Sequence, residues 1–393
     1  MLTPESIGWL LSDSGREALR EAQALQPRPE TFLAVSQRLA RRWPEGLARA
    51  AVDQALLRQR AMPKFPRASE MLFLREALEQ ATSAPLAAHH AARLGDGGPR
   101  FDLGCGLGGD ALALAERGPV VAADRDPLRL LVLRANAGVL GLSERVRPVR
   151  ADLLCPGWKL PAAAVVFADP GRRREGRRIH DASRYDPPLD VLVRIAGNVG
   201  SMGIKLSPGI DRRQVDGLEA EVEFVSEGGE LKECALWFGA SRSPGWRATV
   251  FPSAATLVGP EAPPGRISAV RAVVYEPDPA VLRAGLVRRL ADQLGAEQMD
   301  PELSLLTADS ARPTPLAHAY RVLDVLPFSE KALRQELRRR GVGRVTLKKR
   351  GSAVDTEELG HRLRLKGDGD ATVLLTRLLG RPLAILVEPP AAA

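Results

Sequence analysis

The sequence has few cysteines, few aromatic residues and no long apolar run. The three cysteines, Cys105, Cys155 and Cys234, are odd in number and far apart. This spacing excludes a disulfide framework and a cysteine-based zinc site, and it favours a reducing compartment. No stretch approaches the roughly 18 consecutive apolar residues of a membrane span. The N-terminal segment carries acids and lacks the basic start of a secretory signal. We therefore predict a cytoplasmic protein with no membrane span and no metal site.

Lysine is also scarce, since it supplies only 8 of the 56 basic residues. The net charge is nevertheless +8, which permits a polyanionic partner. A GC-rich genome would produce the same arginine bias. Residues 327–393 hold 14 Lys and Arg against 8 Asp and Glu, a balance of +6. The basic segments there lack interleaved aromatic residues, so they favour contact with the backbone of RNA over base stacking. A solvated charged face is the alternative.

The chain of 393 residues is longer than one average domain. Apolar residues recur at helical spacing in its first part, and a turn-rich segment and a proline-rich segment divide the rest. We predict a helical domain over 1–95, an α/β domain over 96–260 and a basic α/β domain over 261–393. Adjacent histidines point in different directions on a helix. We therefore expect His89 and His90 at the surface or at a domain junction rather than on one metal.

Strands and helices alternate after residue 96, which predicts a parallel sheet with crossover helices. The segments ELKECALWFG and RATVF alternate apolar and polar residues more strictly, and we expect antiparallel strands near one edge of that sheet. The predicted elements are strand 100–103, helix 109–117, strand 119–123, helix 127–140, strand 146–150, strand 164–168, helix 187–198 and strand 200–206.

The stretch RFDLGCGLGGD, residues 100–110, is the centre of this pattern. It places Gly104, Gly106, Gly108 and Gly109 between a predicted strand and a predicted helix. Glycines let the chain turn sharply and let a ligand approach the main chain at a helix N-terminus. With a preceding strand, a following helix and an acid about twenty residues on, the pattern predicts a nucleotide-binding corner.

Four acids follow successive predicted strands: Asp102, Asp124, Asp152 and Asp169. The carboxyl ends of parallel strands meet at one edge of an open sheet, where ligands bind. Asp124 is the acid placed to accept hydrogen bonds from ribose hydroxyls. Its alternative role is to cap the next helix.

The segments DLGCGLGGDALALA, VVAADRDPLRLLVLRANA, VRADLL and VVFADPGRR resemble the successive motifs of class I S-adenosylmethionine-dependent methyltransferases. The wider chain is similar to bacterial members that carry a THUMP-like domain at the C-terminus, through KFPRASEMLFLREALEQATS and LKKRGSAVDTEELGHRLRLKGDGDATVLLTR. The resemblance implies a Rossmann-like sheet with S-adenosylmethionine as the cofactor. THUMP domains are associated with RNA binding.

The resemblance also implies roles for individual residues. Asp124 would bind the ribose, Asp152 would lie near the adenine amine, and Asp169 would lie beside the transferred methyl, with Pro170 following it as the second catalytic position. The implied cofactor site consists of Asp102, Gly104, Gly106, Gly108, Asp124 and Asp152.

The motif at Asp169 departs from one branch of this family. Enzymes that methylate exocyclic amines of bases commonly have Asp or Asn, two prolines and an aromatic residue, whereas this chain has Asp169, Pro170, Gly171 and Arg172. The motif therefore does not predict methylation of an exocyclic amine of a base. Tyr185 could replace the aromatic residue if its loop covers the crevice, and a structural turn before two prolines is the alternative.

Arginines crowd the loop that follows Asp169. Arginine binds phosphate through two parallel hydrogen bonds, which predicts a phosphate-bearing substrate. A solvated loop with internal ion pairs is the alternative. Lys205 follows the next strand, and we expect it to form another wall of the crevice. The predicted substrate-binding residues are Arg172, Arg173, Arg174, Tyr185 and Lys205.

We therefore interpret the chain as an S-adenosylmethionine-dependent methyltransferase that acts on RNA. Two other classes stay open on the sequence. One is an RNA-associated module that keeps a cofactor pocket and transfers no methyl group. The other is a nicotinamide-dependent oxidoreductase, which uses similar glycines.

Overall fold

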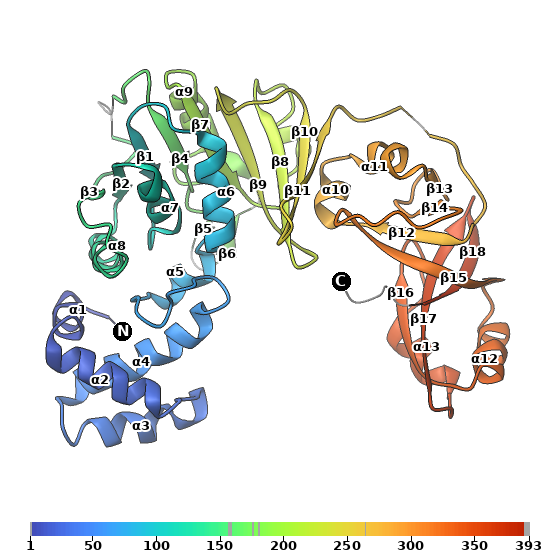
Figure 1. Ribbon diagram of the computed structural model, residues 1–393, viewed down its shortest axis with the longest axis horizontal. Helices are drawn as coiled ribbons and strands as arrows, with labels where there is room; N and C mark the ends of the chain where they lie inside the picture. Colours follow the sequence, from blue (N-terminus) through green and yellow to red (C-terminus); the bar gives the residue numbers. More distant parts are fainter. Residues whose placement is uncertain (1, 156–158, 175–176, 180, 264, 389–393) are drawn as a thin grey trace. The chain divides into compact units, whose positions relative to one another are not determined.

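The computed structural model describes residues 2–155, 159–174, 177–179, 181–263 and 265–388, with only the main chain for 173–174 and 177–178 (Figure 1). The chain divides into two compact units. The first contains Met1–Ala220 and Ala235–Ser243, and the second contains Glu221–Cys234 and Pro244–Ala393. The boundaries predicted near residues 95 and 260 stay a prediction.

The first unit begins with helices, drawn in blue in Figure 1. Thr3 caps the first helix by accepting a hydrogen bond from the Ser6 amide at 3.1 Å. Apolar side chains of these helices and of the following sheet form one continuous core, which includes Leu57, Phe73, Leu114 and Val165. The helices are α1 (Pro4–Leu10), α2 (Asp13–Ala24), α3 (Phe32–Leu39), α4 (Glu45–Ala61), α5 (Arg75–Gln80) and α6 (Ala84–Leu94).

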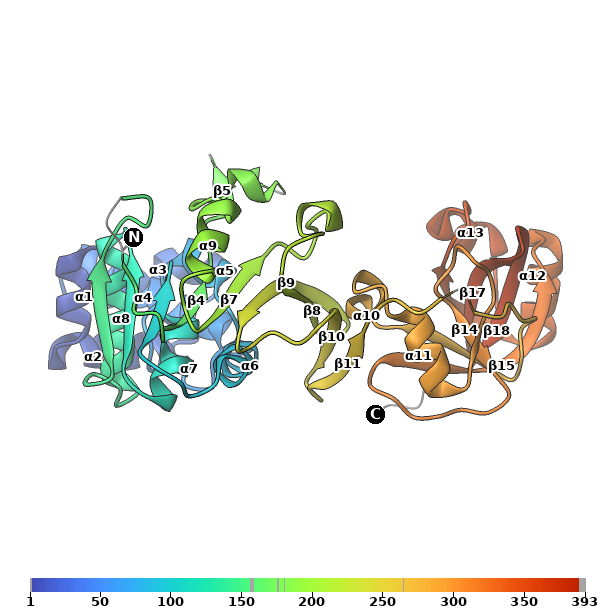
Figure 2. The same cartoon turned by 90° about the horizontal axis from the view of Figure 1, so that it is seen from above.

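Five parallel strands form the centre of the first unit, in the order β7-β4-β1-β2-β3, and β9 lies next to β7 in the same sheet. The pairs β1–β2, β1–β4, β2–β3 and β4–β7 are all parallel. The helices between them cross over as the sequence predicted, and Figure 2 shows them beside the strands. The elements are β1 (Arg100–Leu103), α7 (Gly109–Arg117), β2 (Val120–Asp124), α8 (Pro127–Val139), β3 (Val146–Arg150), β4 (Val165–Ala168), β5 (Arg173–Arg174), β6 (Arg177–Arg178), α9 (Leu189–Ala196), β7 (Ser201–Leu206) and β9 (Glu230–Gly239).

The second unit contains strands β8 (Glu221–Glu227), β10 (Trp246–Phe251) and β11 (Ala255–Gly259). The expectation of antiparallel pairing is only half right here, because β10 pairs antiparallel with β11 and parallel with β8. Alternation of apolar and polar side chains reports which face of a strand is buried, and it carries no information on the direction of the neighbouring strand.

The C-terminal part of the second unit is a seven-stranded sheet in the order β13-β14-β12-β15-β18-β17-β16. Leucines of α12 and α13 pack on β17 and β18, and the Ser329 side chain caps α12. No helix in the described part of the chain has the length and hydropathy to cross a membrane. The elements are β12 (Val273–Pro277), α10 (Pro279–Arg283), α11 (Val287–Leu294), β13 (Glu297–Gln298), β14 (Leu306–Ala308), β15 (Ala317–Pro327), α12 (Glu330–Arg339), β16 (Val342–Lys349), α13 (Thr356–Leu363), β17 (Gly369–Leu378) and β18 (Arg381–Val387).

Candidate functional site

The loop between β1 and α7 turns on three glycines with left-handed backbone angles. The φ values are +81° at Gly104, +54° at Gly106 and +89° at Gly108. A Cβ atom at Gly104 would lie 2.6 Å from the main-chain oxygen of Asp169, and one at Gly108 would lie 2.2 Å from Leu133 Cδ1. A Cβ at Gly106 would have no protein atom within 4 Å. A side chain at Gly104 or Gly108 would therefore collide with protein atoms, whereas the space beside Gly106 is open.

A cleft opens at the carboxyl ends of β1, β2 and β4. It has about 990 Å³ of empty volume, part of it open solvent. One wall comes from α5 and the segment after it. The lining residues are Ala77, Gln80, Ala81, Thr82, Gly104, Cys105, Gly106, Leu107, Gly109, Asp110, Ala123, Asp124, Arg125, Arg129, Ala151, Asp152, Leu153, Asp169, Pro170, Gly171, Arg172, Asp186 and Pro187.

Sequence reasoning did not predict the wall formed by residues 77–82. The only signal was the stretch KFPRASEMLFLREALEQATS, which carried the family resemblance and no assigned role. These residues precede the glycine loop by more than twenty positions, so only tertiary packing brings them to the cleft.

Four of the six predicted cofactor residues line the cleft: Gly104, Gly106, Asp124 and Asp152. Asp124 Oδ2 accepts a hydrogen bond from the Gly106 amide at 3.0 Å, and its Oδ1 accepts one from the Asp126 amide at 2.9 Å. The carboxylate therefore fixes the glycine loop while it borders the cleft. The capping role belongs to Asp126, whose side chain accepts from the Leu128 amide at 2.8 Å.

The other two predicted cofactor residues, Asp102 and Gly108, do not line the cleft. Gly108 packs on Leu133. Asp102 is 1% exposed, and neither of its carboxyl oxygens makes a hydrogen bond. Burial raises the pKa of Asp102 well above its usual range, and the nearby carboxylates of Asp110 and Asp169 raise it further.

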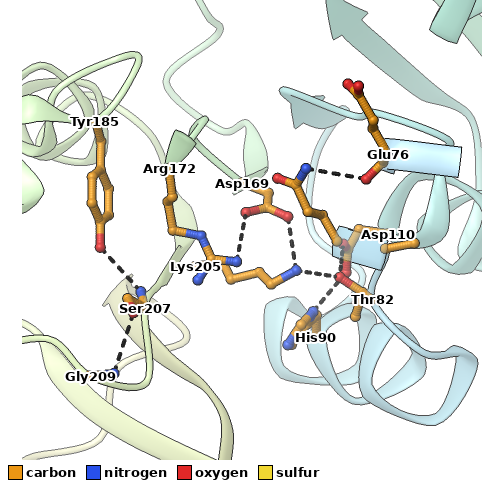
Figure 3. A network of polar contacts seen from close by, with 12 residues as sticks. Glu76, Thr82, His90, Asp110, Asp169, Arg172, Tyr185, Lys205, Ser207 and Gly209 are labelled. Carbon is orange, nitrogen blue, oxygen red and sulfur yellow. Dashed lines mark hydrogen bonds and ion pairs between the residues drawn. The ribbon is translucent and has the colours of Figure 1, made fainter. Parts of the chain in front are cut away.

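The predicted catalytic residue Asp169 takes part in a buried polar network (Figure 3). Lys205 Nζ donates to Asp169 Oδ2 at 2.8 Å and to Thr82 Oγ1 at 2.8 Å. Thr82 Oγ1 donates to Asp110 Oδ2 at 2.9 Å, and His90 Nδ1 lies 2.7 Å from Asp110 Oδ1. The predicted wall residue Lys205 is thus a buried partner of Asp169.

Of the two positions expected for His90, the surface and a domain junction, the surface is wrong, because His90 is 1% exposed. Its ring stacks on Phe167 with centroids 4.4 Å apart, and Trp237 lies 6.0 Å away. An apolar spacing pattern marks this face of α6 as buried, but it cannot show that a carboxylate from α7 meets the ring there. Burial alone would raise the pKa of Asp110, yet the charge and hydrogen bond of His90 hold it below its usual range.

The structure brings only part of the predicted substrate group to the cleft. Arg172 lines it, with Nη2 4.0 Å from Asp169 Oδ1, whereas Lys205 is not among the lining residues. The second predicted catalytic position, Pro170, also lines the cleft. Tyr185 is 2% exposed, lies outside the lining, and has its hydroxyl 3.4 Å from the Ser207 amide. This placement favours the structural turn over stacking on a substrate. The side chains of Arg173 and Arg174 fall outside the described part of the chain.

The strand order, the glycine corner and the acids at the strand ends define a nucleotide-binding α/β protein of the methyltransferase type. Comparison with known proteins narrows this class. The chain is 36% identical over 339 residues to the uncharacterized S-adenosylmethionine-dependent methyltransferase Rv3037c of Mycobacterium tuberculosis (strain H37Rv), covering 83% of this chain and 92% of that protein. The corresponding protein of strain CDC 1551, MT3122, matches equally.

Two family models match parts of the chain. Residues 317–389 match the model described as THUMP domain-like, and residues 3–61 match a domain of unknown function, DUF8688. The crystal structure of a candidate methyltransferase from Porphyromonas gingivalis W83 has the same fold, with a TM-score of 0.75 and 20% identity over 96% of this chain and 99% of that one. The chain belongs to the S-adenosylmethionine-dependent methyltransferases, and its cofactor is S-adenosylmethionine.

Proposed function

We propose that this methyltransferase transfers its methyl group to RNA. The observation that carries the proposal is the THUMP domain-like match over residues 317–389, because THUMP domains are associated with RNA binding. Residues 327–393, most of which lie within this match, have the basic balance of +6. Cytoplasmic RNA is the substrate pool we propose, consistent with buried free thiols at Cys105 and Cys234.

The charges of this region divide into two groups. Eight of its 14 basic residues form ion pairs with acids, for example Arg344 with Asp370 and Arg340 with Asp324. Their charge is already compensated within the protein. The exposed basic residues for which the structure shows no ion pair are Lys331, Arg338, Lys349, Arg364, Lys366 and Arg381. We propose that these six residues, the exposed basic set, contact phosphates.

One observation supports the fit of the cofactor to the cleft: the space beside Gly106 is open, and the Asp124 carboxylate lies next to it. We propose that Gly104 and Gly106 let the methionine part approach the main chain, that Asp124 binds the ribose and that Asp152 lies near the adenine. Bound S-adenosylmethionine supplies an already activated methyl group, so the protein mainly positions the acceptor.

The acceptor side of the cleft follows from the remaining lining residues. Asp169 and Pro170 lie at the end of β4, and the Arg172 guanidinium lies beside them. We propose that Asp169 orients the acceptor group and that Arg172 binds a neighbouring phosphate. No Phe, Tyr, Trp or His is among the described lining residues, which fits recognition by hydrogen bonds and charge better than by stacking.

The test is mass spectrometry of modified nucleosides in RNA from a deletion strain and its parent. We expect one methylated nucleoside to be absent in the deletion strain. Purified protein with tritiated S-adenosylmethionine should then label RNA from the deletion strain and leave parental RNA almost unlabelled. Equal nucleoside profiles together with no labelling of either RNA would contradict an RNA substrate.

One alternative keeps RNA binding without transfer, because the second proline and the aromatic residue are absent after Asp169. That protein would bind deletion-strain RNA and S-adenosylmethionine but label nothing. The other alternative, a nicotinamide-dependent oxidoreductase, is set aside because the chain belongs to the S-adenosylmethionine-dependent methyltransferases.

A further inference from the structure

The polar network behind Asp169 has a fixed direction. A lysine ammonium can only donate, so Lys205 donates to both Asp169 Oδ2 and Thr82 Oγ1. The Thr82 hydroxyl, which accepts from Lys205, has one hydrogen, and it donates that hydrogen to Asp110 Oδ2. His90 closes the series at Asp110 Oδ1. Each partner therefore constrains the next.

The network is almost wholly removed from water. The side chains of Lys205, His90 and Asp110 are 5%, 1% and 8% exposed. Hydrogen bonds between charged groups are stronger in such surroundings, and loss of one partner leaves a buried polar group unsatisfied. Asp169 is the member that reaches the cleft, with a side chain 23% exposed.

The two carboxylate oxygens of Asp169 consequently differ. Oδ2 is occupied by Lys205 at 2.8 Å. Oδ1 has the Arg172 guanidinium 4.0 Å away and accepts no hydrogen bond from the described residues. Asp169 Oδ1 is therefore held in place and can still accept a hydrogen bond. This suits a substrate group that donates a hydrogen bond from an N–H or O–H.

We propose that Lys205, Thr82, Asp110 and His90 are positioning residues that hold the Asp169 carboxylate so that Oδ1 accepts a hydrogen bond from the methyl acceptor. The acceptor class is then a nucleophile that still carries hydrogen. This inference rests on the proposed transfer reaction but not on RNA being the substrate. It also assigns a role to the segment between α5 and α6, which supplies Thr82, and to α6, which supplies His90.

The matched variants are Thr82→Val, which removes the hydroxyl at equal volume, and Thr82→Ser, which keeps it. We expect Thr82→Val to lower kcat at least about tenfold in methyl transfer to total RNA from a deletion strain. The KM for RNA and the Kd for S-adenosylmethionine should change less than about twofold, because Thr82 acts through Asp169. Thr82→Ser should restore most of kcat. A drop in kcat that Thr82→Ser does not restore would contradict the proposal.

The control is Thr376→Val in β17, another buried threonine, whose hydroxyl makes no hydrogen bond in the structure. Its kcat should equal that of the unchanged protein. If Thr82→Val and Thr376→Val have the same effect on kcat, the positioning role is wrong.

A second measurement needs no RNA. Thr82 and Asp169 share Lys205 as a partner, so urea unfolding of Thr82→Val, Asp169→Asn and the double variant should show coupling of about fivefold or more in the unfolding constant. The coupling should vanish when Lys205 is changed to Met. If Thr82→Val and Asp169→Asn show no coupling in the protein that keeps Lys205, the proposal is wrong. Coupling without labelling of RNA would support the network and contradict only the RNA substrate.

Discussion

Burying a carboxyl group without a hydrogen-bond partner costs free energy, and Asp102 is such a group. The neighbouring acids Asp110, Asp169 and Asp124 add to this cost, because their negative charges also disfavour ionisation of Asp102. The raised pKa is the response of a carboxyl group that avoids ionising in this place. At the scale of single residues, burial and the neighbouring acids therefore favour the neutral acid over the carboxylate at Asp102.

We predict that the stability of Asp102→Asn relative to the wild-type protein increases as the pH rises. The unfolded carboxyl loses its proton near about pH 4, while the folded one keeps it to a higher pH. In the window between the two pKa values the wild-type free energy of unfolding falls by up to about 1.4 kcal/mol per pH unit. The variant has no such proton. Urea unfolding near about pH 5 and about pH 7 should show a larger advantage of the variant at the higher pH, and a pH-independent difference would contradict the prediction.

The thiols give a second prediction at this scale. Cys155 is exposed, whereas Cys105 and Cys234 are buried and burial raises the pKa of both thiols. Only the thiolate reacts with alkylating reagents. Iodoacetamide should therefore modify Cys155 in the folded protein and all three cysteines after denaturation, as read by peptide mass spectrometry. Rapid modification of Cys105 in the folded protein would show that the glycine loop opens.

At the scale of elements, the loop from β1 to α7 combines two different uses of glycine. Gly108 is the N-cap of α7, with a left-handed backbone angle and no room for a side chain, because Leu133 of α8 occupies the space. Gly106 has a similar backbone angle and open space beside it. The same residue type thus serves packing at one position and ligand access two positions away.

This difference predicts opposite outcomes for two alanine variants. Gly108→Ala should lose about 2 kcal/mol or more of unfolding free energy, since both backbone strain and overpacking act against it. Gly106→Ala should lose only about 1 kcal/mol through strain but bind S-adenosylmethionine markedly more weakly. Chemical unfolding and isothermal titration measure the two effects. Similar losses of affinity and stability in both variants would mean that the two glycines share one role.

At the scale of the whole molecule, the basic C-terminal region stands out, and eight of the 14 basic residues in 327–393 form ion pairs with acids. The number of basic residues therefore overstates the cationic surface of the C-terminal region, where the exposed basic set is what remains for a polyanion. Salt-dependent binding should follow this set rather than the total number of arginines.

We predict that Lys349→Ala, Lys366→Ala and Arg381→Ala together lower RNA affinity about tenfold or more and flatten its dependence on salt concentration by about 3 units of slope or less. The control removes the same charge from the N-terminal helices through Arg38→Ala, Arg41→Ala and Arg60→Ala. Filter binding over a series of salt concentrations measures both. Equal losses in the two triple variants would point to net charge alone and would contradict a local RNA surface.

Much of the fold could be predicted because its signals are local. Helix α7 begins at Gly109 and ends at Arg117 as expected, and the strands that end near Asp102, Asp124 and Asp169 agree with their predicted limits within one residue. Periodicity, glycine turns and helix caps act over a few residues, so the sequence displays them directly. The direction of β10 beside β8 is not local, and the prediction was wrong there.

The sequence by itself determined the glycine corner, the order of the acids along the chain and the class of cofactor, because each depends on residues close together in the chain. Only the tertiary structure decided what surrounds Asp169. Thr82, His90 and Lys205 come from separate elements and meet through packing of α5, α6 and β7, which no spacing rule encodes. It also decided that Tyr185 is buried and that most C-terminal arginines are paired, since burial and ion pairing depend on neighbours in space.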